Sequence, residues 1–208
     1  MSMRQVIRTL AVAMLLVCLI QGGWSQDVQG DWTNAAAAVI NAAFNTLPDP
    51  TFIRRDVLLI RANARLSEAH VSLREESNWR RVLLAGDSQD PERQEAIEDL
   101  IRANAKTPRL DAWKPLLDRT ISLVEEDVLN EVFADSPAEG WRRFEERFPW
   151  ARALITMSLP GLSRSGNTAV IYIAFERGPL TASGDIYVFR RKAGVWELDG
   201  RLGLGWGS

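Results

Sequence analysis

Cysteine and histidine are almost absent from the chain, with one residue of each in 208 positions. Cys18 lies in an apolar segment near the N-terminus, and His70 is the only imidazole. These counts exclude an internal disulfide, an HExxH metal helix and a zinc site built only from histidine and cysteine. The glycine string Gly203 to Gly207 has no helix after it that could bind phosphate. We therefore expect no metal ion and no other cofactor.

Long hydrophobic runs are also missing. The apolar run from Leu10 to Ile20 is well short of the ~20 residues that a membrane-spanning helix needs. Arg4 and Arg8 precede it, and the small residues Gly23 and Ser25 follow it. This order of charges, apolar core and small residues is typical of a secretory signal peptide cleaved after Ser25.

The sequence thus predicts a signal peptide at residues 1–25 and a single α+β domain at residues 26–208. The exported product would be cysteine-free, would have no membrane span and would be periplasmic or secreted. Arginine far outnumbers lysine and no Asn-x-Ser/Thr sequon occurs, which favours a bacterial protein. Two alternatives stay open: an uncleaved anchor, and a lipoprotein that carries its lipid on Cys18.

An excess of positive charge is lacking as well. The chain has 25 basic and 27 acidic residues, and the mature form would be more acidic, because Arg4 and Arg8 leave with the signal peptide. A nucleic-acid-binding domain needs basic residues in excess on one face. The arginine doublets have acidic neighbours in most cases, so we expect no nucleic-acid partner. They are Arg54-Arg55, Arg80-Arg81, Arg142-Arg143 and Arg190-Arg191.

The two halves of the chain differ in composition. Nine of the fourteen glycines lie from Gly161 onward, and the half before them is rich in Ala, Glu and Arg. Cap residues and apolar spacing predict helices over Trp32–Thr46 after Asp31, over Pro91–Ala105 after Asp90, and from Pro137 after Ser136. The stretch from Ser67 to Ala85 is ambiguous. Short apolar runs predict strands over Val57–Ile60, Thr120–Val124, Leu154–Leu159, Ala169–Phe175, Asp185–Arg191 and Val195–Leu204.

The last of these runs alternates between apolar and charged residues, interrupted only by Gly200. Trp196, Leu198, Leu202 and Leu204 occupy one set of positions, and Glu197, Asp199 and Arg201 occupy the other. A period of two places one set in the core and the other in water. We therefore expect an α+β fold, with N-terminal helices packed on one face of a C-terminal antiparallel sheet of about four to six strands. The exposed Glu197, Asp199 and Arg201, together with Trp206, are the candidate ligand-binding residues.

The C-terminal third resembles a family of uncharacterised exported bacterial proteins. The resemblance covers roughly residues 137–208 and is carried by a W-x-x-F helix that ends in proline, followed by Ser-x-x-Gly, Ala-x-x-Tyr and Gly-x-Trp strands. The residues that carry it are Trp141 to Phe144 with Pro149, Ser158 to Gly161, Ala169 to Tyr172, Gly184 and Trp196. Leu162 replaces an aromatic residue of the family, and residues 176–183 lack a cysteine pair. The resemblance implies export and an α+β fold but no particular activity.

Signals for nucleophilic catalysis are weak. A Ser–His–carboxylate triad would have to use His70, the only histidine. The segment from Gly161 to Ser165 comes close to the G-x-S-x-G nucleophile elbow but lacks the last glycine. No helix pattern follows it, whereas an elbow requires a strand, a turn and a helix.

Carboxylate chemistry stays open, because it needs neither histidine nor cysteine. Glu125 and Glu126 follow a predicted strand and could take part, whereas Glu145 and Glu146 look like a solvated helix face that pairs with Arg142. The leading hypothesis is a non-enzymatic extracytoplasmic binding or interaction domain for an envelope component or a small ligand. The alternatives are a carboxylate-based hydrolase of envelope or polysaccharide material, and a structural or assembly protein of the envelope.

Overall fold

The computed structural model describes residues 26–47, 57–64, 90–202 and 206–207, without the side chains of 26–30 and 206–207. The chain divides into two compact units, Met1–Asn34 and Ala35–Ser208. All packing described below lies within the second unit. The expectations for the signal peptide, for residues 67–85 and for His70 concern residues outside the described part.

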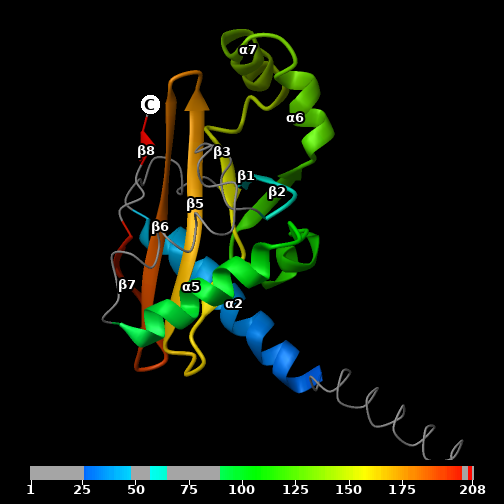
Figure 1. Ribbon diagram of the computed structural model, residues 1–208. Coiled ribbons are helices and arrows are strands. Elements are labelled where there is room, and N and C mark those ends of the chain that lie inside the picture. Colours follow the sequence, from blue (N-terminus) through cyan, green and yellow to red (C-terminus); the bar gives the residue numbers. More distant parts are fainter. Residues whose placement is uncertain (1–25, 48–56, 65–89, 203–205, 208) are drawn as a thin grey trace, which may run out of the picture. The chain divides into compact units, whose positions relative to one another are not determined.

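The second unit is built around one mixed sheet (Figure 1). The strands follow the order β2-β1-β3-β5-β6-β7, while β4 pairs with β5 and β8 pairs with β6. They are β1 (Val57–Arg61), β2 (Thr120–Val124), β3 (Leu154–Met157), β4 (Gly161–Leu162), β5 (Thr168–Gly178), β6 (Thr181–Lys192), β7 (Val195–Arg201) and β8 (Trp206–Gly207). The α+β prediction is confirmed, and the sheet is mostly antiparallel. However, β1 runs parallel to both β2 and β3, which the sequence did not indicate.

The helices are α2 (Gln26–Thr46), α5 (Pro91–Asn104), the 3-10 helix η2 (Asp111–Leu116), α6 (Glu126–Val132) and α7 (Pro137–Arg147). Two of the helices, α5 and α7, begin where the cap residues predict. Asp90 accepts the N–H of Arg93 at 3.2 Å, and Ser136 accepts the N–H of Glu139 at 3.3 Å. Both predicted N-caps are therefore confirmed. Asp31 is not a cap, because α2 already begins at Gln26.

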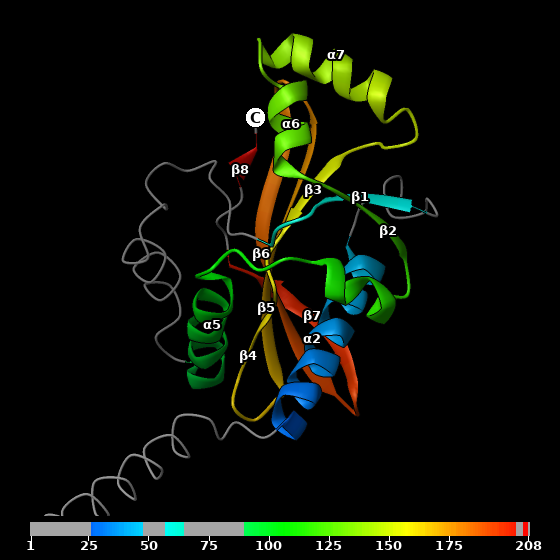
Figure 2. The ribbon, with the colours of Figure 1, turned by 90° about the vertical axis from the view of Figure 1, so that its right-hand side faces the viewer.

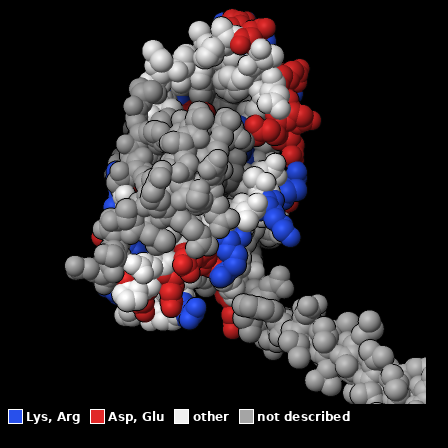
Figure 3. Space-filling view, in the orientation of Figure 1, with Lys and Arg blue, Asp and Glu red and all other residues white. Residues whose placement is uncertain are grey.

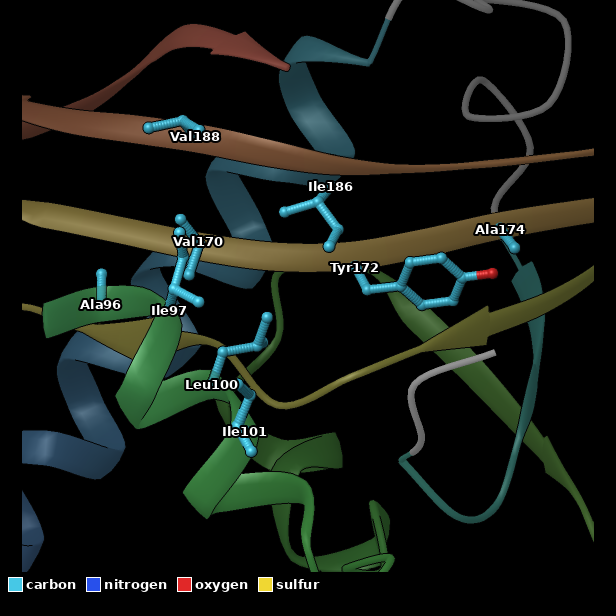
Figure 4. Packing of buried hydrophobic residues seen from close by; sticks show 9 residues of the cluster. All are labelled: Ala96, Ile97, Leu100, Ile101, Val170, Tyr172, Ala174, Ile186 and Val188. Carbon is cyan, nitrogen blue, oxygen red and sulfur yellow. The ribbon is translucent and has the colours of Figure 1, made fainter. Parts of the chain in front are cut away.

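One face of the long strands β5 and β6 is covered by α5. Ile97 and Leu100 of α5 point toward Val170 of β5 and Val188 of β6 (Figure 4). All four side chains are fully or almost fully buried. The apolar residues contributed by β5 and β6 occupy alternate positions, as expected for one face of a pleated strand.

The opposite face of these strands is buried too, so the prediction of N-terminal helices packed on one face of the sheet is confirmed only in part. Ile171 and Ile173 of β5 point away from α5 and are completely buried. Figure 2 shows α5 and the Ala35–Thr46 part of α2 on opposite sides of β5 and β6. The sequence carries the reason, because Ala169–Phe175 is a continuous apolar run, which is typical of a strand covered on both faces.

The helices α6 and α7 form a second core over β1 and β3. Trp141 and Phe144 of α7 pack with Leu59 and Leu154 from the sheet. The Trp141 and Phe144 rings meet edge to face at 4.9 Å between centroids. The inward prediction for Trp141 is confirmed. The helix α6 is not predictable from the sequence, because its seven residues are too few to show a helical period.

A β-bulge interrupts the last long strand. Phe189 of β6 pairs with Leu198, and the neighbouring Val188 pairs with Gly200, so Asp199 has no partner of its own on β6. One extra residue reverses the alternation of side chains beyond it. Leu202 accordingly packs against the α5 core, on the other face from Leu198. The expected single apolar face is therefore wrong at Leu202, and Leu204 lies outside the described residues.

Candidate functional site

The structure separates the four predicted ligand-binding residues. Glu197 and Asp199 lie on the α5 face of the sheet, whereas the bulge turns Arg201 to the opposite face. Trp206 lies on β8, where it pairs with Gly184, and its side chain is outside the described part. These residues do not form one site.

Each of the three charged residues already contacts a partner on the sheet or on α5. Glu197 pairs with Lys192 at 3.1 Å, and Asp199 pairs with Arg190 at 3.4 Å. Arg201 stacks over Tyr187 with 5.3 Å from its Cζ to the ring centroid. The charged residues of β7 thus hold the surface of the sheet together.

A larger polar cluster surrounds Arg190 at the start of α5. Its Nη1 donates to Glu92 Oε2 at 3.1 Å and to Thr168 Oγ1 at 2.7 Å, and its Nη2 binds Asp90. Hydrogen bonds from Ser165 and Thr168 lower the pKa of Glu92 and keep it ionised. A carboxylate with a lowered pKa is a poor general base. The contacts of Arg190 join α5 to β5 and β6.

The segment from Gly161 to Ser165 packs against α5 and holds the start of β5 by a hydrogen bond. Gly161 touches α5 so closely that a Cβ there would lie 2.1 Å from the carbonyl oxygen of Ala96. Ser163 is buried, and its Oγ accepts the N–H of Thr168 at 3.1 Å. Ser163 lies between a two-residue strand and a turn, so the structure rules out the strand–turn–helix of a nucleophile elbow.

The most buried ion pair among the described residues is centred on Arg61, at the end of β1. Its side chain is 12% exposed and contacts two carboxylates from distant parts of the chain. Nη1 lies 3.3 Å from Glu126 of α6, and Nη2 lies 3.3 Å from Glu176 of β5. Nε donates to Thr156 Oγ1 of β3 at 2.9 Å. We call Arg61, Glu126, Glu176 and Thr156 the Arg61 cluster.

The Arg61 cluster lies where an open parallel sheet binds ligands in many proteins. Arg61 is the last residue of β1, and β1 lies between the parallel strands β2 and β3. Along the chain, β2 is added on one side of β1 and β3 is then added on the other side. Such switch points at the carboxyl ends of strands are common ligand sites. Of the Arg61 cluster, only Glu126 is a candidate for carboxylate chemistry on the sequence alone. The other three residues could not be predicted, because their proximity depends on long-range strand pairing.

The two carboxylates of the Arg61 cluster are close enough for two-carboxylate chemistry. Since both contact one planar guanidinium, the nearest oxygens of Glu126 and Glu176 are at most about 9 Å apart, which does not exceed the largest separation found in inverting glycosidases. However, the Arg61 guanidinium itself occupies the space between them. A substrate bond could enter only after Arg61 moved away.

A buried carboxylate lies on the face of the sheet opposite α5. Asp185 is 9% exposed, and burial raises its pKa above the usual range. Its own Oδ1 accepts the N–H of Ile186 at 2.8 Å, and Arg201 lies 3.9 Å from Oδ2. Burial also raises the pKa of the neighbouring Tyr187.

The two terminal strands of the sheet differ in their open edges. The outer strand β7 carries the exposed Glu197, Asp199 and Arg201 and the bulge, all of which hinder pairing with another strand. The strand at the opposite end, β2, has the uncharged sequence Thr-Ile-Ser-Leu-Val without proline or bulge. Of the two terminal strands in the described part of the chain, β2 is therefore the one without these protective features.

The hydrogen bonds of β2 define which backbone groups face outward. Ala62 donates its N–H to the carbonyl oxygen of Val124 at 2.8 Å, so alternate residues of β2, ending at Val124, face β1. Ile121 and Leu123 therefore direct their N–H and C=O groups away from the sheet. Among the backbone hydrogen bonds between described residues outside the ladders, none involves Ile121 or Leu123. We call these outward groups of Ile121 and Leu123 the β2 edge.

Most other charged residues pair locally. Glu146 binds Arg142 on the exposed face of α7, as the sequence predicts, and Glu125 accepts from Arg109 at 2.9 Å. That bond lowers the pKa of Glu125. Figure 3 shows the molecule from the same side as Figure 1. Basic and acidic side chains lie close to each other over the described part of this face, so it is not a uniformly basic surface.

The described residues contain neither a metal-binding group nor a membrane-spanning helix. No group of three or more His, Cys, Asp or Glu residues there could hold a metal ion. None of the described helices has the length and apolar character required to cross a bilayer.

Comparison with known proteins leaves the chain without an assigned family. No family model matches it, and neither a curated protein nor a solved structure gives a match.

Proposed function

We propose that the protein is an exported, non-enzymatic interaction domain that acts in the periplasm or after release. The β2 edge is its binding surface, and an extended strand of another polypeptide is its ligand. The proposal of export rests on the apolar segment Leu10–Ile20 and the small residues after it.

The single observation that carries the binding surface is the edge of β2, which has no charged residue and no strand paired with it among the described residues. A strand that adds to this edge forms main-chain hydrogen bonds with Ile121 and Leu123, whatever its own sequence. Natural sheets usually protect such edges with charges, proline or bulges, as β7 does here. An unprotected terminal strand therefore supports a role in binding.

Site-specific photo-crosslinking tests this proposal. A photoreactive amino acid at Leu123 should give adducts in intact cells of an expressing bacterium. The same group at Glu197, on the protected strand β7, should give few. Equal labelling at both positions, or none at Leu123, would argue against an interaction through β2.

Export is tested separately with the same chain. Mass spectrometry of the protein from the periplasm or the medium should show a mature N-terminus at Gln26. A product that stays in the cytoplasm with residues 1–25 attached would contradict the proposed location.

A carboxylate-based hydrolase is the second candidate, because the Arg61 cluster brings Glu126 and Glu176 together. Turnover of a glycan or peptidoglycan substrate that is lost in both Glu126→Gln and Glu176→Gln would favour it. Glu146→Gln, on the exposed face of α7, is the matched control. Absence of turnover in the unchanged protein would leave the interaction domain, including an envelope assembly role, as the better hypothesis.

A further inference from the structure

We infer that the strand which adds to the β2 edge is β2 of a second copy of this chain. The inference rests on the proposed function, since it names the partner of the same edge. The two β2 strands would run antiparallel around a two-fold axis at Ser122 and would join two sheets into one. Figure 2 looks onto this end of the sheet, with α6 and α7 above β2 and η2 below it.

The direction of the backbone groups permits this register. With the axis at Ser122, Ile121 of one copy lies opposite Leu123 of the other, and the reciprocal pair forms on the far side of the axis. Both residues direct their N–H and C=O groups outward, so each pair exchanges two hydrogen bonds. A shift by a single residue would place outward groups opposite inward ones and would form no ladder.

The charged residues directly adjacent to β2 have opposite signs in the same register. Arg119 precedes the strand and Glu125 follows it, so Arg119 of one copy lies opposite Glu125 of the other. The two-fold axis creates this pair twice. Within one copy, Arg119 donates to Asn45 at 3.3 Å and Glu125 accepts from Arg109, and the side chain of Glu125 stays 46% exposed. Opposite charges directly across an antiparallel pair stabilise it, and like charges destabilise it.

Two further features favour a second copy over an unrelated strand. The residues between the flanking charges are uncharged, so self-pairing brings no like charges together. A two-fold axis also makes every favourable contact occur twice, which is the usual reason that isologous dimers form.

Engineered cysteines test the register directly. The variant Ser122→Cys in a full chain that carries Cys18→Ser has one thiol, located at the axis. Cα atoms of opposite residues in a non-hydrogen-bonded antiparallel pair are about 4.5 Å apart, which suits a disulfide. Mild oxidation should therefore convert most of the Ser122→Cys protein to a covalent dimer.

The matched control is Thr120→Cys in the same background. Thr120 is more exposed than Ser122 and lies on the same face of the same strand. In the proposed register, however, it faces Val124 of the second copy, so its own copy is too distant for a disulfide. Equal crosslinking at both positions, or none at Ser122→Cys, would overturn the inference.

A charge exchange gives an independent readout. Light scattering should show a dimer of the unchanged chain, and Arg119→Glu should weaken it by roughly tenfold, because two like-charged pairs replace two opposite ones. The double variant Arg119→Glu, Glu125→Arg should restore the dimer. A monomeric chain whose Leu123 position still crosslinks to another protein would refute the second copy and leave the proposed function standing. A monomer without such adducts would refute both.

Discussion

Single residues hold this fold together at positions where distant elements meet. Gly161 and Asn104 show how close α5 comes to the segment after β3. The Asn104 side chain donates to the carbonyl oxygen of Leu159 at 2.9 Å and accepts the N–H of the same residue at 2.8 Å. A buried amide that satisfies a backbone donor and acceptor fixes the segment at one height on the helix.

Gly161→Ala should destabilise the protein strongly. The new Cβ would lie 2.1 Å from the Ala96 oxygen and 2.2 Å from the Leu100 nitrogen, and both are backbone atoms that cannot turn away. Overpacking of this kind costs about 1–3 kcal/mol or more. Urea denaturation measures the loss, with Gly200→Ala as the control, because a Cβ at Gly200 meets nothing within 4 Å. Similar midpoints for the two variants would show that α5 lies farther from Gly161.

Asp185 should make stability depend on pH in the direction opposite to most carboxylates. Its raised pKa means that the folded state binds the proton more tightly than the unfolded state. This contribution is complete below the unfolded pKa and is lost as the pH rises through the folded pKa. We expect Asp185→Asn to gain stability relative to the unchanged protein as the pH is raised through this window.

The matched comparison for Asp185 is Glu92→Gln. Since the pKa of Glu92 is lowered, its contribution is present above the unfolded pKa and is lost as the pH falls. Urea midpoints from pH 3 to pH 7 should therefore move in opposite directions for the two variants, each relative to the unchanged chain. Parallel pH profiles would contradict the burial of Asp185.

At the scale of elements, features that depend on a few neighbouring residues could be predicted, whereas long-range strand pairing could not. The caps at Asp90 and Ser136 and the strand at Thr120–Val124 are visible in a few neighbouring residues, and all three are confirmed. The bulge at Asp199 is invisible, because it depends on the pairing with β6. This is why Arg201 does not lie on the same face as Glu197 and Asp199, with which the alternation grouped it.

The two confirmed caps should differ in strength. Ser136→Ala removes one hydrogen bond to the backbone and should cost about 1 kcal/mol. Asp90→Ala also removes the carboxylate that binds Arg190, a half-buried guanidinium, and should cost roughly twice as much. Asp90→Asn, which can still accept from Arg93, should fall between them. Equal losses in thermal or urea denaturation would mean that the pair with Arg190 contributes nothing.

At the scale of the molecule, the fold class was predictable and the coverage of the sheet was not. The alternation around Trp196 belongs to a terminal strand, where it predicts one buried and one exposed face. Extending this pattern to the central strands left the helical layer on their second face unpredicted. The continuous run from Ala169 to Phe175 carried the correct information. The Arg61 cluster likewise joins β1, β3, β5 and α6, whose proximity is a property of the topology alone.

The second compact unit begins at Ala35, so its stability should not depend on the predicted signal peptide. A chain that begins at Gln26 should have the same urea midpoint as the full chain. Phe44→Ala in that shorter chain should cost about 3–5 kcal/mol, because Phe44 of α2 is completely buried. Ala35 to Thr46 would then be an integral layer of the fold while residues 1–25 would be dispensable for folding. A lower midpoint in the chain that begins at Gln26 would assign the N-terminal segment a part in the folded unit.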